Sequence, residues 1–313
     1  MRGAIAFAGS CVFMLSTLAV GDVMEIGGRL YEFSNQAYLG QTAAEMGPGN
    51  LTTGFEAVDG FVPGFIGGQS GWTTFAASLT QGHIDTANPA AGAQHLRISK
   101  DPALASGILT GAFSPDQGPL AVGPSSVSVD IAISNTFGAD YDVVAQAPSQ
   151  AMLSARVKFS FVGNIFIVDD LGAGLIFVDT GVAWNVGPYT NLTINIDPVA
   201  DTIDYFYGGA PIYSSVGGVF AGTTIEQVVL FSDNFHLAGE SGDFDNFSVV
   251  EIDVCPTDVN GDGVTNVLDL IDLLLCFGQP GNPPCDAQDI NTDGAVNVLD
   301  LIDLLLAFGT ACP

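Results

Sequence analysis

Positive charge is scarce in this sequence of 313 residues, which contains only 6 Lys and Arg residues against 34 Asp and Glu residues. Nucleic acids and anionic membrane surfaces are bound through clustered cations, so neither is expected as a partner of a chain with a net charge of −28. However, 48% of the residues are hydrophobic. This fraction is enough to form a core and excludes an intrinsically disordered chain.

Glutamate is rare as well, with 7 residues, whereas Gly (39) and Pro (16) are frequent, which favours strands and turns over helices. A retaining glycosidase needs two carboxylates about 5–5.5 Å apart. Neither Glu-x-Asp-x-x-Glu nor Glu-x-x-x-Glu occurs in the chain, and Glu226 stands alone. We interpret Glu226 as a solvated residue, and we predict no catalytic residue.

The one long apolar run lies at the start of the chain. Met1-Arg2 is followed by the apolar stretch Ala4–Val20, which predicts a Sec-type signal peptide, residues 1–21, cleaved near Ala19 or Gly21. An uncleaved anchor is the alternative reading, because about 20 apolar residues span a bilayer. We expect a secreted or cell-surface protein with no membrane span after cleavage.

Short alternating strands fill residues 55–253, and the N-terminal segment 22–54 is expected to supply the first strand or strands. Alternation in 127–133 and in 155–161 predicts strands with one solvated face, where Arg156 and Lys158 would lie. Two apolar runs flank Gly208-Gly209, which predicts a hairpin. Many such strands without a helical period predict an antiparallel β-sandwich.

Four features of this region resemble a known family: Gly54-Phe55-Glu56, Gly71-Trp72, the predicted hairpin Tyr205–Tyr213 and Gly242–Val249. They are similar to motifs of the concanavalin A-like, laminin-G-like jelly rolls of exported bacterial proteins. The resemblance implies a scaffold that is used for glycan binding, for polysaccharide hydrolysis or cleavage, or as a spacer. Fold alone does not choose among these roles.

Other candidate sites in the sandwich are weaker. Sugar stacking requires exposed aromatic rings. Five aromatic residues are candidates, although aromatics at strand spacing are more often part of the core: Trp72, Trp184, Tyr189, Tyr205 and Tyr207. His95 and Arg97 share one strand face, where an ion pair at a strand edge is favoured over a binding site. Asp243, Asp245 and Asn246 are candidates either for a further structural Ca²⁺ or for capping a turn.

A repeat with a period of 31 residues follows in the C-terminal region, 254–313. Each copy contains a 12-residue segment with oxygen side chains at positions 1, 3, 5, 9 and 12 and Gly at position 6, a spacing that suits Ca²⁺. Position 7 would offer a backbone carbonyl, and position 9 would bind directly or through water. The predicted ligands are Asp258, Asn260, Asp262, Val264, Asn266 and Asp269 in the first loop, and Asp289, Asn291, Asp293, Ala295, Asn297 and Asp300 in the second.

Helix-breaking residues precede each loop, so each unit is a loop followed by one helix, half of an EF-hand. This arrangement resembles the type I dockerin domain, and it implies a module that binds two Ca²⁺ ions. Asp at position 12 departs from the longer Glu of a typical EF-hand, so the helix must begin closer to the ion.

The helices that follow the loops are nearly identical, since residues 266–278 and 297–309 agree at twelve of thirteen positions. They hold more large apolar residues than two short packed helices can bury. Either a second protein covers the excess or the helices pack on the sandwich. The dockerin resemblance implies a cohesin-like partner, although apolar residues stand where many dockerins have Ser or Thr. The candidate partner-binding residues are Val267, Leu268, Leu274, Leu275, Val298, Leu299, Leu305 and Leu306.

Four cysteines remain after signal cleavage, and all lie in the C-terminal region, which suggests two disulfides in an exported chain. Because the termini of a dockerin lie close together, the resemblance implies the pairs Cys255–Cys312 and Cys276–Cys285. Cysteine-flanked dockerins of this form, the GC-type variant, occur at the C-termini of exported proteins.

Together these features predict an exported, carbohydrate-binding β-sandwich that a calcium-dependent dockerin anchors to a cohesin-like or cell-surface partner. Two alternatives stay open: a polysaccharide hydrolase or lyase attached to the same module, and a non-catalytic structural surface protein.

Overall fold

The computed structural model describes residues 23–32, 36–38, 50–75, 81–118, 124–172, 174–198, 200–216, 225–252, 255–260, 262–281, 284–285, 287–291, 293–310 and 312. The predicted signal peptide and the predicted boundary at residues 253–254 lie outside these ranges. Within the ranges, neither helix is long and apolar enough to cross a bilayer.

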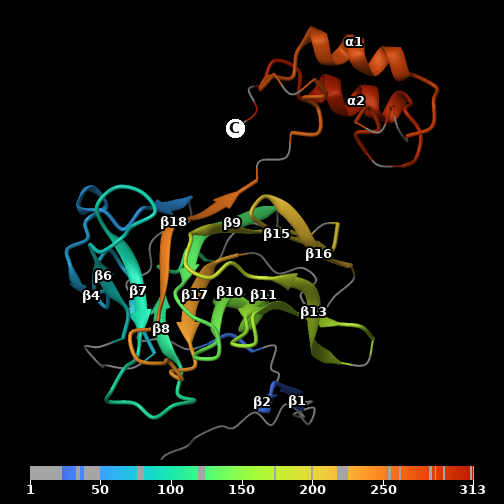
Figure 1. Cartoon of the computed structure of the whole chain (residues 1–313). Helices are drawn as coiled ribbons and strands as arrows, with labels where there is room; N and C mark the ends of the chain where they lie inside the picture. Colours follow the sequence, from blue (N-terminus) through green and yellow to red (C-terminus); the bar gives the residue numbers. More distant parts are fainter. Residues whose placement is uncertain are drawn as a thin grey trace, which may run out of the picture.

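Two antiparallel sheets form most of the molecule (Figure 1). The seven-stranded sheet has the order β13 (Leu175–Ala183), β12 (Asn164–Asp170), β11 (Met152–Phe159), β10 (Tyr141–Ala147), β17 (Gln227–Ser232), β8 (Thr110–Phe113), β5 (Thr73–Thr74). The nine-stranded sheet has the order β16 (Ala210–Val216), β15 (Thr202–Tyr207), β14 (Thr190–Asp197), β9 (Ser125–Ile133), β18 (Ser241–Glu251), β7 (His95–Ser99), β6 (His83–Asp85), β4 (Gly64–Phe65), and β3 (Leu51–Thr53) also pairs with β18. Two 3₁₀ turns, Ala57–Asp59 and Pro148–Gln150, complete this region.

The alternation in the sequence explains how the sheets pack. Val127, Val129 and Ile131 of β9 are buried, and the residues between them are only partly so. They join one core cluster with residues of the seven-stranded sheet such as Val143 and Val157. The predicted hairpin is confirmed, because β15 and β16 pair around Gly208 and Gly209, whose φ angles of 60° and 76° suit glycine. The predicted antiparallel β-sandwich is therefore present.

One prediction about the seven-stranded sheet is wrong. Arg156 and Lys158 do lie on the face turned away from the core, but they are buried rather than solvated. Both donate hydrogen bonds to Asp142, each at 2.7 Å. Tyr31 and Tyr38 of the N-terminal segment pack over this face, since Tyr31 contacts the Phe177 ring and the Tyr38 hydroxyl accepts from Arg156. The predicted first strands thus include a separate two-stranded sheet, β1 (Val23–Ile26) and β2 (Arg29–Glu32).

The C-terminal region contains two helices, α1 (Val267–Cys276) and α2 (Val298–Leu306), which contact each other (Figure 1). Five buried residues form their core: Leu273, Cys276, Cys285, Val296 and Leu304. Disulfides join Cys255 to Cys312 and Cys276 to Cys285, the pairing expected from the sequence. Such cross-links are typical of small domains in oxidising compartments, because a small core alone stabilises a fold weakly.

Candidate calcium loops and helix faces

The first loop gathers its acidic side chains around one point. One carboxylate oxygen from each of Asp258, Asp262 and Asp269 lies within 4.8 Å of the others. Backbone N–H groups hold these carboxylates in place: Asp262 N and Gly263 N donate to Asp258 at 3.0 and 2.8 Å. Gly263 has a φ of 86°, the left-handed conformation that position 6 of such a loop requires. Converging oxygens of this kind match the ligands that Ca²⁺ prefers.

The second loop repeats this hydrogen-bond pattern. Asp293 N and Gly294 N donate to Asp289 at 3.1 and 2.9 Å, and Gly294 has a φ of 91°. Hydrogen bonds donated by the side chain of Asn297 hold the pKa of Asp293 below its ordinary value, so this carboxylate stays charged at neutral pH. The two loops therefore share their hydrogen-bond pattern, whereas among the described residues only the first loop brings three carboxylates within 4.8 Å of one another.

The last ligand position of each loop is also part of a helix N-terminus. Asp269 is fully buried, and its two oxygens accept from Asn260 N at 3.0 Å and from Asn266 N at 2.8 Å. Asp300 accepts from Asn291 N and Asn297 N in the same way. These contacts close a capping box with the Asn at position 9, so the short Asp side chain joins the loop to the first helical turn. The helix begins close to the ligands, as Asp at position 12 requires.

The two Asn residues at position 9 have a more specific arrangement than the sequence indicated. The side-chain oxygen of Asn266 accepts from Leu268 N at 2.7 Å, and its amide donates to the Val264 carbonyl at 2.9 Å. Asn297 makes the matching contacts with Leu299 N and the Ala295 carbonyl. Because each Asn oxygen caps its helix, the arrangement favours the water-mediated role over direct ligation.

Short backbone pairings link each loop to the segment that follows a helix. Val296 of the second loop pairs with Gly278 and Gln279, just after α1. Thr265 of the first loop pairs with Gly309 and Thr310, just after α2. The Cys255–Cys312 disulfide lies beside this second pairing, because Cys312 N donates to the Gly263 carbonyl at 2.9 Å. Loops, helices and cross-links thus form one unit with near two-fold internal symmetry.

All eight predicted partner-binding residues are exposed, and Leu275 and Leu306 reach 78% and 80% exposure. Each helix buries one apolar stripe and leaves another outside. Sequence reasoning missed four further exposed apolar residues of this surface. Two of them are isoleucines four residues after Val267 and Val298, a helical spacing that could have indicated them. These four are Ile271, Phe277, Ile302 and Phe308. We call the twelve residues together the apolar helix faces.

Most aromatic candidates for sugar stacking, and Glu226, have structural roles in the sandwich. Trp72, Trp184, Tyr205 and Tyr207 are buried in the core, as the strand spacing favoured, and Tyr189 is partly buried. None of the four buried rings can stack on a sugar. Glu226 is 1% exposed, which corrects the expectation of a solvated residue. It accepts from the backbone N–H and the hydroxyl of Ser149, at 2.8 and 2.5 Å.

Asp243 and Asp245, the acidic candidates for a third Ca²⁺ site, both form contacts with other residues of the protein. Arg97 donates to both oxygens of Asp243, at 2.8 and 3.0 Å, and to Asp85 at 2.7 Å, so the favoured ion pair is present. Burial acts to raise the pKa of Asp243, but His95 and Arg97 outweigh it and hold the pKa below its ordinary value. Asp245 accepts from Ala90 N and Ala91 N. These contacts favour a structural role over a third Ca²⁺ site.

No family model matches this chain, and no curated protein is detectably similar to it. Solved structures with a similar shape include a sialidase, with 10% identity, a TM-score of 0.44, and coverage of 59% of this chain and 17% of the sialidase. An endo-β-1,4-glucuronan lyase from the fungus Trichoderma reesei has 12% identity, a TM-score of 0.44, and coverage of 61% and 94%. Galectin LEC-6 of Caenorhabditis elegans has 9% identity, a TM-score of 0.32, and coverage of 50% and 96%. At such low scores, no residue role is transferred from these proteins.

Proposed function

We propose that residues 254–313 form a dockerin-like module that folds around two Ca²⁺ ions and attaches an exported β-sandwich to a protein partner. The observation that supports this most is the match between the two loops. Oxygen side chains at five positions recur in the same hydrogen-bond pattern, and each loop leads directly into a helix with an exposed apolar stripe.

Calcium would compensate for the small core of the helical unit. Three carboxylates of the first loop lie within 4.8 Å of one another, an arrangement that repels without a cation. Binding neutralises this repulsion and fixes the start of each helix through Asp269 and Asp300. In this proposal Asn260 and Asn291 and the carbonyls of Val264 and Ala295 complete the ligand sets, with the position-9 Asn residues acting through water.

The apolar helix faces are the proposed attachment surface. Soluble proteins rarely leave contiguous apolar patches of this kind uncovered. A cohesin-like partner with an apolar docking site suits Leu268, Leu275 and their equivalents Leu299 and Leu306. Packing of the same faces on the sandwich is the competing arrangement, and exposure of all twelve residues favours the partner.

Calorimetric titration of the mature, oxidised chain with Ca²⁺ tests the metal sites. We expect two ions per chain, and Asp269→Ala and Asp300→Ala should each remove one. Asp272→Ala is the matched control, because Asp272 lies on α1 outside the loop. A wild-type titration without binding heat, together with helicity that EDTA leaves unchanged, would disprove the calcium module.

The role of the sandwich is a separate proposal, that of a carbohydrate-binding domain attached to this module. Phe137 is 72% exposed and available for stacking, whereas four of the five aromatics first considered are buried. The polysaccharide-enzyme alternative needs an accessible carboxylate pair, but the Asp140 side chain is fully buried and Asp233 is bound by Arg29. A glycan array probed with the mature chain is the test: binding that Phe137→Ala weakens supports the proposal, and no binding rejects it in favour of the structural alternative.

A further inference from the structure

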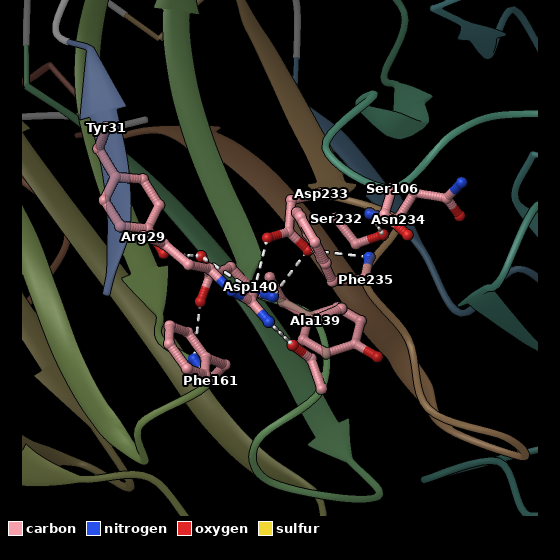
Figure 2. Close-up of polar contacts among 12 residues, drawn as sticks. Arg29, Tyr31, Ser106, Ala139, Asp140, Phe161, Ser232, Asp233, Asn234 and Phe235 are labelled. Carbon is pink, nitrogen blue, oxygen red and sulfur yellow. Dashed lines mark hydrogen bonds and ion pairs between the residues drawn. The ribbon is translucent and has the colours of Figure 1, made fainter. Parts of the chain in front are cut away.

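Several residues of the sandwich contact the guanidinium group of Arg29. Arg29 extends from strand β2 toward Asp140 and Asp233 (Figure 2). Its Nη1 donates to Asp233 Oδ2 at 2.9 Å, and its Nη2 donates to the Gly138 carbonyl at 2.6 Å. The guanidinium carbon also lies 3.7 Å from the ring centroid of Phe161 and 4.2 Å from that of Phe235. Asp140 Oδ2 lies 3.9 Å from Nη1 as well, so two carboxylates, one carbonyl and two aromatic rings surround a single cation.

The hairpin that supplies Arg29 is attached by side chains. Strands β1 and β2 pair with each other and belong to neither large sheet in the described part of the chain. Ile26 enters the core cluster, and the Tyr31 hydroxyl donates to Asp140. Arg29 adds the charged contact. The docking of the hairpin therefore depends on a few side-chain contacts rather than on a strand ladder.

The charges around Arg29 explain why a cation is favoured at this position. Three carboxylates, Asp140, Asp142 and Asp233, face three basic groups, Arg29, Arg156 and Lys158, in one network. Lys158 and Arg156 are held by Asp142, at 2.7 Å each. Withdrawing Arg29 would remove the cation that contacts Asp233 and would leave Asp140 and Asp233 near each other among largely buried side chains, where negative charge is unfavourable.

The arrangement also indicates which cation fits. A guanidinium is planar, so its edge can donate to a carboxylate and a carbonyl while its face lies against aromatic rings. An ammonium is compact and strongly hydrated and lacks this fork. We infer that Gly138, Phe161, Asp233 and Phe235 form a guanidinium-binding site, and that Arg29 is its tethered ligand, which fastens the N-terminal hairpin. When the hairpin detaches, the site is open to another guanidinium compound or arginine side chain.

The test uses the full mature chain with Arg29→Ala. Hydrogen exchange of residues 23–32 should accelerate roughly tenfold or more, as expected for the loss of a charged hydrogen bond. Guanidinium chloride at a millimolar, non-denaturing concentration should raise the Tm of this variant and leave the wild-type Tm unchanged, because Arg29 fills the wild-type site. Methylammonium chloride at equal ionic strength should have no such effect.

Two further variants complete the test. Arg29→Ala combined with Asp233→Asn should lose the guanidinium-dependent rise in Tm, because the carboxylate is gone. If Arg29→Ala does not fold, Arg29→Lys keeps the charge without the fork and should still respond to guanidinium. An equal response to guanidinium and methylammonium, or no response to either in a folded variant, would overturn the inference.

Discussion

The sandwich and the C-terminal helical unit differ in what holds each of them together. The sandwich buries large side chains such as Trp72, Tyr141 and Phe244 in one extensive cluster. The core of the helical unit contains five buried hydrophobic residues, two of them disulfide-bonded cysteines. It also leaves twelve apolar residues of its helices and their ends exposed.

This difference shows how the same kind of residue can serve stability in one region and binding in another. Leucine and valine in the two large sheets are mostly buried, some in strands that alternate with polar residues, such as β9, and some in continuous apolar runs, such as that of β17. In the helices they surround the axis, so one stripe is packed and the other is left for a partner. The helical unit then depends on cross-links and, in our proposal, on Ca²⁺.

The largest expected effect comes from a core substitution in the sandwich. Phe244→Ala removes a fully buried ring and should lower the free energy of unfolding by about 4–5 kcal/mol. Urea unfolding followed by tryptophan fluorescence measures this directly, since both tryptophans, Trp72 and Trp184, lie in the sandwich core. Phe137→Ala, at a ring that is 72% exposed, is the control and should change stability by less than about 0.5 kcal/mol.

Removing the Cys255–Cys312 disulfide should destabilise the helical unit and leave the sandwich unchanged. Cys255→Ser with Cys312→Ser opens a connection between residues 57 positions apart and should destabilise the helical unit by roughly 3–4 kcal/mol. Thermal unfolding monitored by helical circular dichroism should show the loss, while tryptophan fluorescence should not. A matching shift of the tryptophan transition would show that the two regions unfold together, contrary to our comparison.

The sandwich should show a pH dependence that originates at Asp233. Burial, with the nearby Asp140 charge, raises the pKa of Asp233 from 3.8 to about 7. A carboxyl whose pKa is raised on folding stabilises the fold below its unfolded pKa, and this contribution is lost as pH rises through 7. The stability of wild type relative to Asp233→Asn should therefore fall between pH 4 and pH 7, by at most about 1.4 kcal/mol per pH unit. A stability difference that stays constant with pH would contradict this assignment.

The smallest stability effect is expected on the apolar helix faces. Leu275→Lys with Leu306→Lys should change unfolding free energy by less than about 0.5 kcal/mol, because both side chains are exposed. Partner binding, measured in solution with a cohesin domain, should be abolished. Leu273→Ala is the contrasting variant on the same helix, with an expected cost of about 2–5 kcal/mol because Leu273 is fully buried.

Features set by residues close together in the sequence could be predicted, whereas features set by contacts between distant residues could not. The hairpin at Gly208-Gly209 and the gathering of three carboxylates in the first loop follow from spacing within a dozen residues, while their role as Ca²⁺ ligands stays a prediction. The burial of Arg156 and Lys158 could not be predicted. The alternation shows which face of the sheet they lie on but not which segment covers that face, and Tyr38, which contacts Arg156 there, is 118 residues away in the chain. Glu226 was misjudged for the same reason, since its partner Ser149 is 77 residues distant.

The central claim is that Ca²⁺ stabilises the helical unit and not the sandwich. Hydrogen exchange of the mature, oxidised chain with excess Ca²⁺ and with EDTA tests it at both regions in one experiment. We predict that α1 and α2 exchange roughly a hundredfold faster or more in EDTA, while strands β10 and β17 keep the same rates. Helices that exchange equally slowly in both conditions would contradict the account.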